Sequence, residues 1–235
     1  MSNQIERLKS SAGHLLDAFL ILRQTYAILE PMVLDENAFK LRGSGKQATG
    51  FKILRNVLSL SCAQDIAKLT LDADKRTPSI INFVSSLQCS SLREDLRKQF
   101  RGWQVPRYDK ETDPAIIDAL NQMEVRSQRD RSKDFDRLYS ELEERWILLS
   151  ECRSMGCFLT IKDKLTAHKE VCPVADKYQF VDVESLGLLW VDLKYAIDQM
   201  QRIVEILQLL IRNSGMAWDL VTERVIESGR NFWLE

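Results

Sequence analysis

The residues best suited to proton chemistry lie in one short segment, Lys162-Asp163-Lys164-Leu165-Thr166-Ala167-His168. The chain has only two histidines, and histidine is the side chain whose ordinary pKa lies nearest neutral pH. His168, next to lysines and an aspartate, is therefore the natural candidate for a general acid or base. The other histidine, His14, falls among apolar residues of a predicted first helix, where we expect it to pack or to cap.

Two interpretations of this segment stay open. A histidine in the last turn of a helix is favoured by the helix dipole, so the segment can be purely structural. On an ideal helix, steps of about 100° per residue leave Lys162 and His168 about 120° apart. The two side chains can therefore converge on one phosphate only if the helix ends between them, or if two chains bring their copies together.

A second set of candidate residues lies in a basic stretch between residues 93 and 108. Aromatic side chains are interleaved there with cations, a mixture that suits single-stranded nucleic acid because bases stack on rings and phosphates pair with charge. The cations expected to contact nucleic acid are Arg97, Lys98, Arg101 and Arg107, together with Lys164 from the histidine segment. The alternative is a solvated helix end whose aromatic residues pack into the core.

Other patterns do not support a site. The stretch 124–137 balances five basic residues with four acidic ones, which is typical of a solvated helix face. The Gly43–Lys46 loop lacks the glycine and the Ser or Thr that a Walker A loop needs, and no predicted strand precedes it. His168 and Cys172 supply too few ligands for zinc, and no family signature of a cysteine protease surrounds any cysteine.

The composition is that of an ordinary soluble globular protein, with 45% hydrophobic and 29% charged residues. The net charge is −1, so any contact with nucleic acid must come from a local patch. No apolar run approaches the roughly 20 residues that a membrane span needs. The five cysteines form no CxxC pair, as expected of reduced thiols. We therefore expect a cytoplasmic protein with no membrane segment, no metal and no other cofactor.

The apolar periodicity predicts an all-α bundle. Helices are expected at about 5–33, 48–71, 77–101, 113–167 with a break at Gly156, 183–213 and 216–228. Thr77-Pro78 and Asp113-Pro114 are the expected starts of two of them, and Gly229 is expected just after the last. Residues 41–47 and 173–182 are expected to be loops. We expect residues 1–212 to form the bundle, and residues 213–235 to form a helical extension packed on it.

The sequence resembles the HEPN superfamily, and most closely its abortive-infection, AbiU-like branch. The resemblance rests on residues 51–72, on the Lys75–Ile80 start of the next helix and on residues 161–168, and the helix at 180–207 fits the same pattern. In the third piece, Lys162-Asp163-Lys164 and Ala167-His168 stand where the family typically has Arg-Asp-Lys-x-x-Ala-His. These pieces together cover most of residues 1–212.

HEPN proteins are helical bundles, and many are metal-independent ribonucleases that act as dimers in antiviral or toxin–antitoxin systems. The resemblance implies that His168 is the catalytic acid or base, and that Asp163 is the polar residue that follows the family's arginine. It implies that Lys162 takes the place of that arginine and stabilises phosphate charge. We therefore expect a homodimer that cleaves RNA, with an antitoxin protein or a nucleotidyltransferase as a candidate partner.

The lysine at position 162 leaves a second hypothesis open. Lysine keeps the positive charge of arginine but loses the planar fork that binds phosphate through two hydrogen bonds. The chain can therefore also be a catalytically inactive HEPN-like module that binds RNA, a nucleotide or a partner protein. A third hypothesis is a helical adaptor unrelated to the family.

Overall fold

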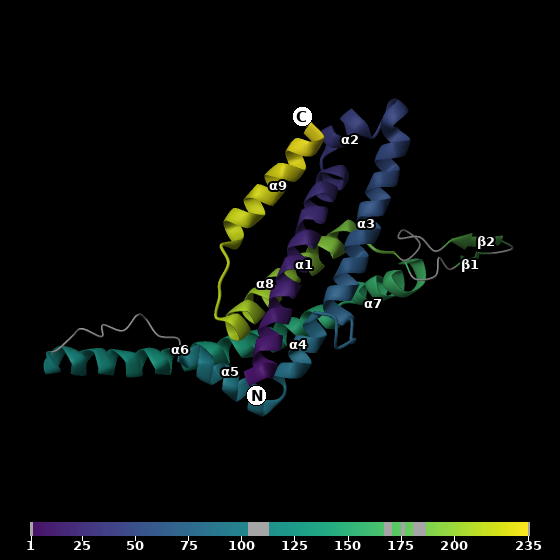
Figure 1. Cartoon of the computed structure of the whole chain (residues 1–235). Helices are drawn as coiled ribbons and strands as arrows, with labels where there is room; N and C mark the ends of the chain where they lie inside the picture. Colours follow the sequence, from purple (N-terminus) through teal and green to yellow (C-terminus); the bar gives the residue numbers. More distant parts are fainter. Residues whose placement is uncertain (1, 103–112, 167–170, 175–176, 181–186, 235) are drawn as a thin grey trace.

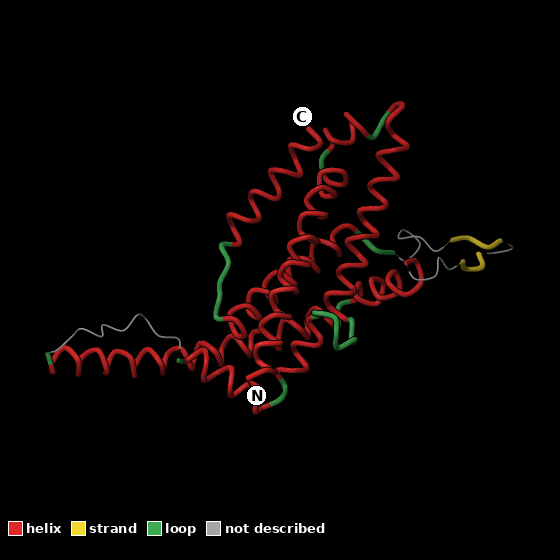
Figure 2. Tube along the Cα trace, viewed as in Figure 1, coloured by secondary structure: helices red, strands yellow, loops and turns green. Residues whose placement is uncertain are grey.

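The computed structural model describes residues 2–102, 113–166, 171–174, 177–180 and 187–234, and most of them are helical (Figures 1 and 2). The α-helices are α1 (Ser2–Leu34), α2 (Glu36–Arg42), α3 (Ala48–Leu71), α4 (Ile80–Leu87), α5 (Ser90–Arg101), α6 (Pro114–Ser150), α7 (Arg153–Thr160), α8 (Trp190–Leu207) and α9 (Trp218–Leu234). A 3-10 turn, η1 (Gly45–Gln47), precedes α3, and two π-helical segments, η2 (Ile161–Thr166) and η3 (Gln208–Arg212), follow α7 and α8. The predicted all-α fold class is confirmed.

The hydrophobic core gathers around α1 and α8. The buried stripe of α1 includes Leu15, Phe19 and Leu22, which repeat at the three- and four-residue spacing of one helix face. α8 buries residues on nearly every turn, among them Ile197 and Val204. α1 packs against α3, α8 and α9, and α6 packs against α5 and α8. In Figure 1, α1 runs lengthwise through the bundle with α3 and α9 on its two sides.

A smaller apolar cluster closes one end of the bundle. Its buried members are Met32, Ala38, Phe51 and Trp233, which come from α1, α2, α3 and α9. The Trp233 indole N–H donates to the carbonyl oxygen of Ile28 at 2.7 Å, so the end of α9 is tied to α1. The sequence pattern did not predict α2, whose seven residues begin after the N-cap Asp35.

Several predicted boundaries agree with the structure and others do not. α3 spans the predicted residues, and the Asp113 carboxylate accepts from the Ala115 N–H at 2.8 Å at the predicted start of α6. The predicted helix over 77–101 is wrong, because it consists of α4 and α5. The predicted start at 183 is also wrong, since α8 begins at Trp190.

The segment expected as a loop contains a hairpin instead. β1 (Val171–Val174) and β2 (Lys177–Phe180) pair antiparallel, with Val171 opposite Phe180 and Val174 opposite Lys177. Figure 2 shows this hairpin projecting from the bundle next to the end of α7. It follows η2 in the sequence and so lies directly beyond the candidate histidine segment.

The last helix is longer than the sequence predicted. Gly229 lies inside α9 rather than after it, so the predicted helix end is wrong. This glycine faces the backbone of α1 at Ala27. α9 packs along α1 and also touches α2. The division of the chain into a bundle (residues 1–212) and an extension (residues 213–235) stays a prediction. No helix in the described part of the chain is long and apolar enough to cross a membrane.

Candidate functional site

Lys162 is placed by a short helix and a π-helical turn that pack against α3. α7 buries Met155 and Phe158, and η2 continues directly from its end. Ile161, the first residue of η2, is fully buried and anchors the turn in the core. The next side chain, Lys162, is 24% exposed. π-helical turns are rare and frequently occur at functional sites, and this one carries three of the predicted site residues.

The charged partner of Lys162 comes from the far end of α3. The Asp72 Oδ2 atom lies 3.5 Å from the Lys162 Nζ atom, and the two side chains are 23% and 24% exposed. The two residues are 90 positions apart in the sequence, and Asp72 is the C-cap of α3. The ion pair therefore joins the candidate segment to the body of the bundle.

The loop that carries Asp72 is held by a compact set of hydrogen bonds. The Asp72 Oδ1 atom accepts from the Asp74 N–H at 3.1 Å, and the Asp72 carbonyl oxygen accepts from the Ser79 hydroxyl at 2.5 Å. The Asn82 amide donates to the carbonyl oxygens of Asp72, Asp74 and Thr77 at 2.8 to 3.1 Å. Asp72 is a residue that the sequence pattern did not single out. The spacing Asp72-x-Asp74 signals a turn, but it gives no sign of the distant lysine.

The rest of the predicted catalytic set is only partly described. Asp163 lies in η2 with an exposed side chain, and the backbone of Lys164 lies in the same turn. His168 falls between Thr166 and Val171, outside the described residues. Cys172 belongs to β1 and not to a helix. Among the described residues, no cluster of three or more His, Cys, Asp or Glu could hold a metal ion.

The predicted RNA-contacting cations of α5 have different surroundings. The Arg97 guanidinium donates to both carboxylate oxygens of Asp136 on α6, at 2.9 and 2.8 Å. Lys98 and Arg101 are exposed, and Arg107 lies outside the described residues. Phe100 packs edge-on against Phe135, with 5.7 Å between the ring centres. This contact agrees with the alternative interpretation, in which the aromatic residues of this helix end pack into the core. α5 packs against α4, α6 and η3, whereas η2, which carries Lys162, packs against α3 and α7.

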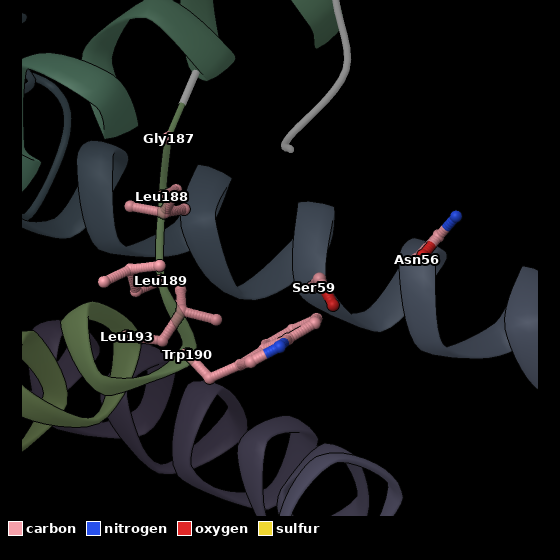
Figure 3. Close-up of a pocket in the computed structure, with 7 residues that line it drawn as sticks. All are labelled: Asn56, Ser59, Gly187, Leu188, Leu189, Trp190 and Leu193. Atoms are coloured by element: carbon pink, nitrogen blue, oxygen red, sulfur yellow. The ribbon is translucent and has the colours of Figure 1, made fainter. Parts of the chain in front are cut away.

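A cavity of about 260 Å³ lies where the middle of α3 meets the start of α8 (Figure 3). It is lined by Asn56, Ser59, Gly187, Leu188, Leu189, Trp190 and Leu193. The Trp190 indole extends towards Ser59 in this view. Ser59 lies thirteen positions before Asp72, which corresponds to about 20 Å along α3. None of the seven described lining residues is charged, and Lys162 is not among them.

Two further sequence expectations concern His14 and the cysteines. His14 is exposed on α1, so the expectation that it packs is wrong. Among the described residues, Cys62, Cys89 and Cys152 form no disulfide. Burial raises the pKa of the Cys62 thiol to about 12, with a smaller contribution from Asp65, so this cysteine is a core residue rather than a nucleophile.

Comparison with known proteins identifies one family. The chain matches the HEPN family AbiU2 over residues 3–232. No match is found among the curated proteins or among the solved structures. The matched region includes nearly all of α1 and α9, the Asp72 loop and the Lys162–His168 segment.

Proposed function

This chain belongs to the AbiU2 family of HEPN proteins, and on that premise we propose that it is a metal-independent endoribonuclease. It would act in a prokaryotic abortive-infection or toxin–antitoxin system. The observation that carries the proposal is the match over residues 3–232, which spans the whole Lys162–His168 segment. Membership of the family also excludes the hypothesis of an unrelated helical adaptor.

The proposed reaction uses the 2′-hydroxyl group of RNA as the nucleophile. Its oxygen forms a bond to the adjacent phosphorus while the bond from phosphorus to the 5′-oxygen of the next nucleotide breaks. His168 accepts the proton of the 2′-hydroxyl group or donates a proton to the leaving oxygen. The Lys162 ammonium stabilises the negative charge that builds up on the phosphate, and Asp163 is the polar residue beside it.

The partners of this proposed enzyme follow from the same premise. RNA is the substrate, and Lys98, Arg101, Arg107 and Lys164 are proposed contacts to its phosphates. Because Arg97 is already bound through both carboxylate oxygens of Asp136, we expect it to contribute less to RNA affinity than Lys98. A homodimer is the proposed assembly, and an antitoxin protein or a nucleotidyltransferase is the proposed regulator.

The deciding experiment compares the two histidines in an RNA-cleavage assay. His168→Ala should lower the rate by about 10²- to 10⁴-fold, as expected for loss of a general acid or base. His14→Ala is the matched control, because this histidine is exposed on α1 and should be dispensable. EDTA should leave cleavage intact, and an RNA with a 2′-deoxy group at the cleaved position should resist. Cleavage that survives in His168→Ala would show that the site lies elsewhere.

A second function, binding without cleavage, is favoured by one observation at the same position. Lys162 replaces the arginine that the family typically carries, and its ammonium faces the Asp72 carboxylate. A binding module predicts that the wild-type chain leaves RNA intact yet retains it in a filter-binding assay. Lys98→Ala and Arg101→Ala should then weaken retention, and His168→Ala should not.

A further inference from the structure

The contact between Asp72 and Lys162 is the feature from which a new residue role follows. It links the end of α3 to η2 across 90 residues of sequence, with 3.5 Å between Oδ2 and Nζ. Both side chains are more than three-quarters buried, so the pair is screened less by salt than a pair on the open surface. The position of the ammonium group is therefore coupled to the position of α3.

Asp72 is itself fixed by neighbours that do not involve Lys162. One carboxylate oxygen accepts from the Asp74 N–H, and the carbonyl oxygen of Asp72 accepts from Ser79 and Asn82. The Ser79 side chain is fully buried, and its hydroxyl makes this contact instead of capping α4. The loop between α3 and α4 therefore holds the second carboxylate oxygen of Asp72, Oδ2, towards the Lys162 ammonium group.

We propose that Asp72 is a positioning residue for Lys162, and this inference rests on the proposed ribonuclease function. A lysine ammonium is a point charge at the end of a flexible four-carbon chain, whereas an arginine carries a rigid planar fork. A carboxylate fixed by the α3–α4 loop supplies the orientation that the lysine lacks. Asp72 does not touch the reacting atoms in this scheme, since it acts through Lys162.

The chain contains a matched control for this role two residues further on. Asp74 accepts the Arg76 N–H at 3.0 Å, in the same way that Asp72 accepts the Asp74 N–H at 3.1 Å. Both aspartates therefore cap the backbone of one loop, and Asp74 pairs with Arg76 while Asp72 pairs with Lys162. Asp72→Asn and Asp74→Asn each keep an acceptor oxygen for the loop and remove one charge.

The experiment measures kcat and KM for RNA cleavage by the full chain and the two variants. Asp72→Asn should lower kcat by about 10- to 100-fold, because small displacements of a catalytic group cost rate on this scale. Asp74→Asn should keep wild-type kcat, and Asp72→Glu should recover part of the loss. A purely structural role predicts equal kcat in the two Asn variants, and that result would overturn the proposal.

A second measurement does not depend on activity. The rate at which acetic anhydride acetylates Lys162 is followed by mass spectrometry, with the exposed Lys98 as internal reference. Asp72→Asn should raise the Lys162 rate several-fold, because the amine loses its ion pair with the Asp72 carboxylate, and Asp74→Asn should not. Unchanged acetylation in Asp72→Asn would overturn the proposal. If the wild-type chain does not cleave RNA, the ribonuclease function fails, and the acetylation rates still decide whether Asp72 holds Lys162.

Discussion

Lys162 differs from the arginine of the family pattern in geometry rather than in charge. A guanidinium group binds phosphate through two parallel hydrogen bonds, and an ammonium group binds as a point charge. The structure adds that Lys162 lies on a π-helical turn and faces Asp72, and this ion pair limits the directions that its side chain can take. The position of the Lys162 ammonium group therefore depends on its neighbours. An arginine at position 162 would face the same Asp72 carboxylate.

The substitution Lys162→Arg tests the importance of that geometry. If the lysine is a weaker version of the family cation, restoring the fork should raise the initial rate of RNA cleavage or leave it unchanged. Lys162→Gln is the control, because it removes the charge while keeping a polar side chain, and it should be slow. A Lys162→Arg variant as slow as Lys162→Gln would contradict the assigned role.

Glu141 on α6 joins two arginines in the most connected ion-pair network of the described residues. Arg202 donates to both Glu141 carboxylate oxygens at 2.8 Å, and Arg145 donates to one of them at 2.9 Å. Hydrogen bonding to Arg202, followed by that to Arg145, lowers the pKa of Glu141 from 4.5 to about 2 despite partial burial. The network connects α6 to α8, so it stabilises the helix pair that supports the core.

This pKa predicts how the stability of the protein depends on pH. The folded pKa lies below the unfolded one, so the stabilisation is complete above pH 4.5 and is lost as the pH falls towards 2. Glu141→Gln should cost about 1–3 kcal/mol of unfolding free energy at pH 7 and less at pH 3. Urea unfolding at the two pH values measures this difference.

An exposed pair supplies the control for the Glu141 prediction. Glu36 and Lys40 lie one turn apart on α2 with most of both side chains in solvent. Glu36→Gln should change the unfolding free energy by less than about 0.5 kcal/mol at either pH. An equal effect of the Glu36 and Glu141 variants would argue against the network.

The sequence could nominate residues for the candidate site, but it could not predict what surrounds them. Lys162 and Asp163 were identified because a local spacing carries the family pattern. Asp72 lies 90 residues away, and only the packing of α7 and η2 on α3 brings it to Lys162. The pairing of Arg97 with Asp136 could not be predicted either, because it depends on the packing of α5 against α6.

At the scale of the helices, local signals predicted some boundaries correctly, whereas the expected start at Thr77-Pro78 and the expected break at Gly156 are wrong. Asp113 caps α6 as expected, and the periodicity of α3 gave its full length. The break between α4 and α5 was missed because the apolar spacing continues across Gln88 and Cys89, where no Gly or Pro marks the break. The hairpin was missed because strands of four residues are too short to show an alternating pattern.

Gly229 shows how packing can override a local signal. A glycine near a helix end predicts a C-terminal cap, yet this one lies inside α9 at its crossing with α1. A β-carbon there would collide with the Ala27 carbonyl group, and the Ile28 nitrogen would lie only 3.2 Å away. The glycine is required for close approach of the two helices, a tertiary property that the sequence around it does not reveal.

Replacing Gly229 by alanine should therefore loosen α9. The new methyl group must push the two backbones apart, and overpacking of this kind typically costs about 1–3 kcal/mol. The unfolding free energy should fall accordingly, and the fluorescence of Trp233 should shift as its contact with Ile28 is strained. Denaturant titration with circular dichroism and fluorescence measures both effects.

Gly50 provides the comparison for this helix-crossing prediction. It also lies inside a helix, α3, but a β-carbon there would meet no atom within 4 Å. Gly50→Ala should leave stability unchanged or raise it by up to about 1 kcal/mol, because alanine is the better helix former. If Gly229→Ala and Gly50→Ala have the same unfolding free energy, the backbones of α9 and α1 do not approach closely at Gly229.

For the whole molecule, the open question is how a lysine and a histidine six positions apart serve one phosphate. Residues 161–166 form a π-helical turn, so the described part of the segment does not have the α-helical spacing of about 100° per residue. A closed two-fold pair is the commonest oligomer, and it would place two copies of the segment together. We therefore expect a homodimer in which Lys162 of one copy and His168 of the other act on the same phosphate.

Mixing two inactive variants tests this shared site directly. Lys162→Gln and His168→Ala should each be inactive alone, and sedimentation should show both as dimers at micromolar concentration. After mixing and subunit exchange, about half of the dimers contain one chain of each kind, and each of these keeps one intact shared site. Cleavage should then recover to about a quarter of the wild-type rate. If both residues act within a single chain, no mixture recovers activity, because every site in it lacks one of the two. If sedimentation shows a monomer, the shared site has no basis. If cleavage recovers before the subunits have exchanged, a contaminating nuclease is responsible, and assays of each variant alone reveal it.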